Sequence, residues 1–103
     1  MKTIILAFAT VALVGGAAYA VTPGTYSGHE LARSANVTID QARAIALKAH
    51  PGKITDQELE KESGGSGLRY SFDISSAAKT YEVGVDAQSG AVLENKVEGN
   101  NPD

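Results

Sequence analysis

The chain has 103 residues, a formal net charge of −3 and no cysteine. A domain of this length has room for one modest hydrophobic core, which here must hold together without disulfide bonds. The acidic balance and the lack of any cluster of lysine and arginine argue against electrostatic binding to nucleic acid or to an anionic membrane.

The N-terminus has the pattern of an export signal. A basic residue precedes an apolar run over residues 4–14, and the small residues Ala18 and Ala20 follow at the spacing that a signal peptidase accepts. An uncleaved membrane anchor is the alternative, but the apolar run is shorter than the roughly 20 residues that a spanning helix requires. We therefore expect a signal peptide over residues 1–20, cleaved before Val21. The mature protein is then expected in the periplasm or outside the cell, with no remaining membrane anchor.

The rest of the chain divides into a lead-in, a domain and a tail. Residues 21–36 show no sustained pattern, which predicts a flexible N-terminal segment with at most a short helical turn near residues 30–33. Periodic sequence then begins, and we place the domain at residues 37–97. Residues 98–103 are expected to form a polar C-terminal tail.

The domain opens with a strong helix signal. Thr38 and Gln41 have the spacing of a capping box, and the following run to His50 is rich in alanine and other good helix formers. Apolar residues recur on one face at helical spacing, which predicts an amphipathic helix with Arg43 and Lys48 away from that face. A Pro-Gly dipeptide ends the helix.

Beyond the helix the apolar residues recur at every second position, as they do in strands. A strand over residues 54–62 alternates poorly and carries many acids, which suits an exposed edge. Residues 68–75 and 80–85 alternate cleanly, and a short strand at residues 91–93 is followed by polar sequence from Glu94 onward. The prediction is an α+β fold: one N-terminal amphipathic helix packed on one face of a three- to four-stranded antiparallel sheet.

Catalytic and metal-binding patterns are missing from the sequence. His29 and His50 are the only histidines, they are too far apart to form a helical metal pair, and no cysteine is available. Residues 86–94 share a few oxygen-bearing positions with a calcium loop, but their spacing favours a tight β-turn. No serine or acid lies in a recognisable catalytic motif. We therefore predict no enzymatic activity, no cofactor and no metal site.

Several stretches of the chain together resemble a PepSY domain, over about residues 37 to 97. The most specific are the alanine-rich helix closed by Pro-Gly and the strand that ends in Asp-Ala, two further residues and a glycine. The matching stretches are Ile39-Asp40-Gln41-Ala42, Pro51-Gly52-Lys53-Ile54, Leu59-Glu60-Lys61-Glu62, Tyr70-Ser71-Phe72-Asp73-Ile74 and Tyr81 to Leu93. The resemblance implies the same helix-and-sheet architecture and a role without catalysis. PepSY modules occur in propeptides of secreted metallopeptidases and in small stand-alone exported bacterial proteins.

Two functions follow as hypotheses. The first is a protein-binding module whose partner is a peptidase, inhibited or regulated in trans because no peptidase follows in this chain; the contact would use a sheet edge or a loop. The second is a sensor of a small ligand or metal ion in the cell envelope. For either role, the candidate interaction face is the polar side of the two clean strands: Arg69, Ser71, Asp73 and Glu82.

Overall fold

The computed structural model describes residues 26–98. The expected signal peptide, its cleavage site and the last five residues lie outside this range. The elements are η1 (His29–Ser34), α2 (Ile39–Ala49), β1 (Lys53–Lys61), β2 (Leu68–Ser76), β3 (Lys79–Asp86) and β4 (Val92–Val97).

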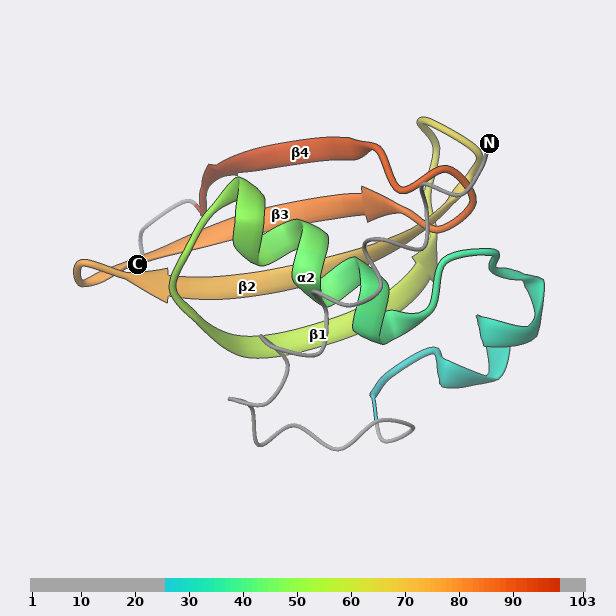
Figure 1. Cartoon of the computed structure of the whole chain (residues 1–103), viewed down its shortest axis with the longest axis horizontal. Coiled ribbons are helices and arrows are strands. Elements are labelled where there is room, and N and C mark those ends of the chain that lie inside the picture. The colour runs from blue at the N-terminus through green and yellow to red at the C-terminus, as the bar shows by residue number, and fades with distance from the viewer. Residues whose placement is uncertain (1–25, 99–103) are drawn as a thin grey trace, which may run out of the picture.

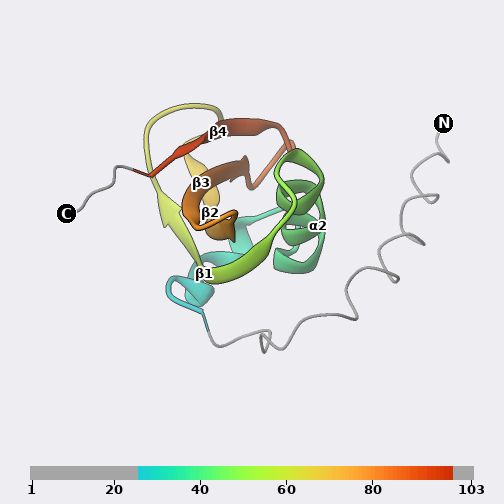
Figure 2. The same cartoon turned by 90° about the vertical axis from the view of Figure 1, so that its left-hand side faces the viewer.

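The four strands form one antiparallel sheet in the order β1-β2-β3-β4, which is also their order along the chain. α2 lies across one face of this curved sheet, and no other described element covers the opposite face (Figures 1 and 2). The predicted α+β architecture is therefore confirmed. The helix that covers the sheet follows a short 3₁₀-helix, η1, instead of standing first among the described elements.

α2 begins where the capping box predicts. The Thr38 hydroxyl accepts a hydrogen bond from the backbone N–H of Gln41 at 3.1 Å, and the Gln41 side chain accepts from the backbone N–H of Thr38 at 2.9 Å. Its buried apolar residues are Ile39, Ala42 and Ala46, the last two with no exposed surface. Small side chains on this face let the helix approach the sheet closely.

Arg43 corrects one prediction about this helix, because it belongs to the buried face. Its side chain is only 8% exposed, and it donates to Asp40 at 2.7 Å and to the side chain of Gln57 on β1 at 3.4 Å. An alanine-rich face leaves room for the aliphatic stem of an arginine, while the guanidinium finds polar partners. Helical spacing alone does not reveal those partners, since Gln57 comes from another element.

The poor alternation of the first strand has a structural cause. The register of β1 with β2 shifts between Ile54 and Asp56, so Thr55 is an extra residue in a β-bulge. The bulge changes which positions face the core, and Ile54, Gln57 and Leu59 are the buried ones. A single inserted residue thus hides an ordinary two-residue period.

β4 corrects the prediction that the last strand ends at Leu93. The strand continues to Val97, and Glu94, Asn95 and Lys96 pair opposite residues of β3. This strand lies at the edge of the sheet and is at least partly exposed along its length. Polar residues on both sides of β4 therefore cost little folding free energy, and the strand lacks the alternation that is expected of a half-buried strand.

From residue 26 onward, the segment expected to be flexible is packed against the sheet. Tyr26 is buried at 7% exposure with its ring 6.5 Å from that of Tyr70. The backbone N–H of Leu59 donates to the carbonyl of Ser27 at 2.9 Å, so this segment covers part of the outer edge of β1. The helical turn expected near residues 30–33 is present as η1.

Asp86 joins two loops at one end of the sheet. Its carboxylate accepts from the backbone N–H groups of Ser66 at 2.7 Å, Ser89 at 2.8 Å and Gln88 at 3.1 Å, and from the Ser89 hydroxyl. These hydrogen bonds, chiefly those from the backbone of Ser66 and then of Ser89, hold the pKa of Asp86 well below its usual range. The residue caps the turn after β3 and fixes the loop between β1 and β2 against it.

Ala87 connects the same end of the sheet to the segment that leads into α2. Its carbonyl accepts from the backbone N–H groups of Asn36 at 3.0 Å and Val37 at 2.9 Å, and its own N–H donates to Leu68 at 2.8 Å. Its methyl group is fully buried. Gly90 closes the turn with a φ of +83°, a left-handed conformation that favours glycine. Each fixed position of the Asp-Ala, two residues, glycine pattern therefore has a physical role.

Replacing Asp86 with asparagine is expected to lower the free energy of unfolding by about 2 kcal/mol at pH 7, because charge-assisted hydrogen bonds are lost. The folded-state pKa of Asp86 lies below the unfolded value of about 3.9, so its contribution is full above that pH and is lost as the pH falls through the folded pKa. Denaturant unfolding from pH 7 to pH 2 checks this. The difference between wild type and Asp86→Asn should shrink with acid, and the exposed control Glu30→Gln should show no such difference. A constant difference at all pH values would contradict this account.

Candidate interaction face

The four residues expected to form an interaction face lie on the same side of the sheet, away from α2. Asp73 on β2 stands directly opposite Glu82 on β3, with Arg69 and Ser71 further along β2. On its other side Asp73 is opposite Asp56 of β1. Side chains directly opposite each other in neighbouring strands point to the same face. The polar sheet face thus forms as the strand pattern predicts.

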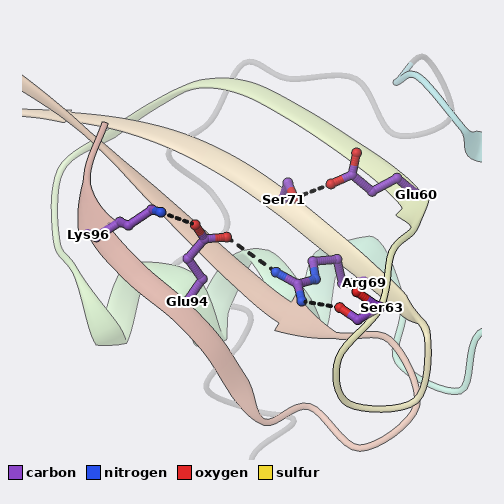
Figure 3. A network of polar contacts seen from close by, with 6 residues as sticks. All are labelled: Glu60, Ser63, Arg69, Ser71, Glu94 and Lys96. Carbon is purple, nitrogen blue, oxygen red and sulfur yellow. Dashed lines mark hydrogen bonds and ion pairs between the residues drawn. The ribbon is translucent and has the colours of Figure 1, made fainter. Parts of the chain in front are cut away.

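Arg69 is held by partners within the chain. Its guanidinium donates to Glu94 on β4 at 3.2 Å and to the carbonyl of Ser63 at 3.1 Å (Figure 3). To reach β4 it passes over β3 at Gly84, where an added Cβ would stand 3.2 Å from the guanidinium. Glycine at position 84 leaves the space for this crossing. Lys96 binds the other oxygen of Glu94 at 3.2 Å and extends the network.

The four residues differ in what they offer to a partner. Arg69 and Ser71 are buried, at 8% and 7% exposure, and the Ser71 hydroxyl donates to Glu60 at 2.9 Å. Asp73 and Glu82 are half-buried, and among the described residues no group donates a hydrogen bond to their carboxylates. Arg69 and Ser71 therefore hold neighbouring segments together. Asp73 and Glu82 have carboxylates that remain available to a partner.

This face carries more acids than the alternation of β2 and β3 predicts. The register adds Asp56, Glu58 and Glu60 from β1 and Glu94 from β4. The sequence pattern predicts only an exposed edge for the three β1 acids, and it places Glu94 beyond the last strand. The bulge in β1 and the true length of β4 were needed to find them, and a search for alternation that tolerates one inserted residue would have recovered the β1 acids.

The electrostatics of the face follow from this excess of acids. Burial, and then the charges of Glu98 and Asp56, raise the pKa of Asp73. Burial, and then Glu94 and Asp73, raise the pKa of Glu82. Burial also raises the pKa of Glu58, with a further contribution from Glu60. Their negative forms are therefore held at a cost in free energy, and a positive charge placed on this face would be favourable.

Chemistry other than charge has little support from the described residues. Within residues 26–98, no three histidine or acidic side chains are arranged to hold a metal ion. His50 stacks on Tyr81 with ring centroids 3.7 Å apart, whereas His29 lies edge-on to Tyr26. The carboxylate of Asp86, which the calcium-loop alternative requires, is occupied by backbone N–H groups.

Comparison with protein families agrees with this architecture. Residues 36–96 match the family model described as "Peptidase propeptide and YPEB domain", named PepSY. The chain belongs to the PepSY family. The PepSY match covers α2 and nearly all of the sheet, and η1 lies outside the matched residues. No curated protein and no solved structure matches the chain.

Within this PepSY sheet, Asp73→Asn is expected to raise the thermal midpoint at pH 7, because it removes a half-buried negative charge and the repulsion of that charge with Asp56 and Glu82. The folded-state pKa of Asp73 is raised, so wild-type stability should increase as the pH falls from 7 toward about 4, where the unfolded-state carboxyl takes up its proton. Thermal unfolding across this range checks the sign. Asp73→Asn should flatten the increase, and Glu30→Gln should leave it unchanged. A lower midpoint for Asp73→Asn at pH 7 would show that its charge stabilises the fold instead.

Proposed function

We propose that this protein is an exported, non-catalytic PepSY module that binds a peptidase and regulates it in trans. The observation that carries the proposal is the match of residues 36–96 to a family described by its place in peptidase propeptides. A propeptide module acts by binding an enzyme, so the function of this protein would be to bind another protein. The described part of the chain adds a compatible surface, the uncovered polar sheet face.

Export is part of this proposal. The basic residue at the start, the apolar run and the small residues Ala18 and Ala20 support a cleaved signal peptide over residues 1–20. No helix within residues 26–98 has the length and apolar character to cross a membrane. The mature protein would then work in the periplasm or outside the cell, where a secreted peptidase is available as a partner.

When the full chain is expressed with its own N-terminus, the exported product is expected to begin at Val21. Intact mass and N-terminal sequencing of the periplasmic or secreted fraction measure this. Ala20→Gln should block cleavage, because the peptidase pocket accepts small side chains at that position, whereas Ala17→Gln should be processed normally. A product that retains residues 1–20 and stays in the membrane fraction would refute the export part of the proposal.

Charge complementarity supports the polar sheet face as the contact. Asp73, Glu82 and Glu58 carry negative charge that neighbouring acids and partial burial make costly. A basic segment of the peptidase laid on this face would relieve that cost and would steer the encounter between the two proteins. Arg69 and Ser71 would contribute by keeping the strands and the loop in position, since the two terminal guanidinium nitrogens of Arg69 and the hydroxyl of Ser71 are already bonded within the chain.

Titration of the mature protein against the secreted peptidases of the same cell is expected to inhibit at least one of them. The double variant Asp73→Asn/Glu82→Gln should raise the inhibition constant about tenfold or more and reduce its dependence on salt, because two facing charges are removed. Glu30→Gln, an acid on η1, is the matched control and should inhibit like the wild type. If no peptidase is bound or inhibited, the regulatory function is wrong. If the double variant inhibits as strongly as the wild type, the protein regulates a peptidase but the polar sheet face is not the contact.

A further inference from the structure

The two edges of the sheet differ in what covers them. Along β1, Ser27 pairs with the outer edge and η1 packs beside it. Along β4, no described residue pairs with the outer side. Val92 and Val97 are also 43% and 46% exposed, and they are the exposed large apolar residues of the described chain. An uncovered edge strand with exposed valines offers hydrogen-bonding groups to a further strand.

The hydrogen bonds of β4 show which of its backbone groups face outward. The backbone N–H of Glu98 donates to Thr80 on β3 at 2.8 Å, so position 98 points inward. In an antiparallel ladder the direction alternates along the strand. Lys96 and Glu94 therefore also point inward with their backbone groups, and Asn95 and Val97 present their N–H and C=O groups to the outside. A strand added here would bond to Asn95 and Val97.

The side chains of β4 are complementary to a second copy of the same strand. If two β4 strands pair antiparallel about a two-fold axis at Asn95, Glu94 stands opposite Lys96 of the partner subunit, and the reverse holds by symmetry. These positions are the non-hydrogen-bonded ones, where opposing side chains come closest. Sliding the register one step either way would place Glu94 opposite its own copy or Lys96 opposite its own copy, which is unfavourable. A register centred on Val97 would rely on residues beyond the end of β4.

Glu94 lies in the acidic part of the polar face. Glu94 is bound by Arg69 and Lys96 of its own chain, yet it still raises the pKa of Glu82, and Glu98 adds further negative charge. Lys96 of the partner subunit would bring a positive charge to this part of the face. Glu94 of the partner subunit would likewise stand opposite Lys96, so the pairing joins opposite charges across the two strands without removing the excess of acid.

We propose that two copies of this chain associate through β4, antiparallel about Asn95, and join their sheets into one continuous sheet. The occupant of the β4 edge is thus a second copy of the chain. Because the shared edge is only one short strand, the area buried is small, and the dimer is expected to form reversibly as concentration rises. This inference does not rest on the proposed peptidase regulation, and either one can fail without the other.

A single introduced cysteine tests the register, because the chain has no cysteine of its own. At Asn95→Cys, two copies would meet in a hydrogen-bonded pair with Cα atoms about 5.5 Å apart, which suits a disulfide. Under mild oxidation this variant should form a covalent dimer several-fold faster than Thr55→Cys, an exposed control on β1. Equal rates would refute the β4 contact, and faster cross-linking of Val97→Cys would refute the register centred on Asn95.

Sedimentation of the mature protein tests the contact without a cysteine. We expect the weight-average mass to rise toward that of a dimer between about 10 μM and about 1 mM, the range of weak specific association. Asn95→Pro removes an outward N–H, and Lys96→Glu places like charges opposite each other. Both should remain monomeric, with melting transitions that show they are folded, while the charge-matched control Lys53→Glu should dimerise like the wild type. A wild-type protein that stays monomeric throughout this range, or a mass increase that Asn95→Pro retains, would overturn the proposal.

Discussion

The buried carboxylate of Asp86 and the neighbouring backbone of Ala87 hold together parts of the fold that are distant in sequence. The carboxylate binds the loop after β1 and the turn after β3, and the Ala87 carbonyl binds the segment that leads into α2. A chain with no cysteine cannot use a disulfide for this purpose. Charge-assisted hydrogen bonds to backbone N–H groups take that role, and they depend on a residue that stays ionised at neutral pH.

A second buried polar contact supports the same region. The hydroxyl of Tyr70 donates to the carbonyl of Val37 at 2.7 Å, directly before α2, and burial raises the pKa of Tyr70 to about 12. The hydroxyl therefore keeps its proton over the whole physiological range and stays a donor. The start of the helix is thus fixed from two sides, by a side chain of β2 and by the backbone after β3. All of these contacts lie on the α2 side of the sheet, and no described element covers the opposite face.

How much of this structure the sequence predicts depends on whether the signal is local. The capping box of Thr38 and Gln41 and the alternation of β2 involve neighbouring residues only, and both are found where expected. The bulge at Thr55, the burial of Arg43 and the length of β4 depend on residues of other elements. The same holds for the interaction face. The alternation of the strands is enough to place Asp73 and Glu82 on it, whereas the burial of Arg69 depends on Gly84 and Glu94, which lie on other strands.

The two faces of the sheet contribute to stability with opposite sign. Phe72, Ile74 and Val83 are completely buried beneath the helix, and their burial supplies the main driving force for folding. On the other side of the same strands, Asp73 and Glu82 face each other with raised pKa values, which costs stability. Neutral residues at these two positions would make the fold more stable, so the charges of the polar face are kept at a cost in folding free energy.

The simple strand order has a consequence for the timing of folding. Each strand pairs with the next one along the chain, so the sheet can grow by short-range steps that require little loop closure. α2, in contrast, is synthesised before every strand but is anchored by Ala87, near the end of the domain. The contacts of the helix with β1 and β2 are therefore completed only when the turn after β3 has formed. The early steps of folding are thus local, and the contact that places the helix joins segments that lie far apart in the chain.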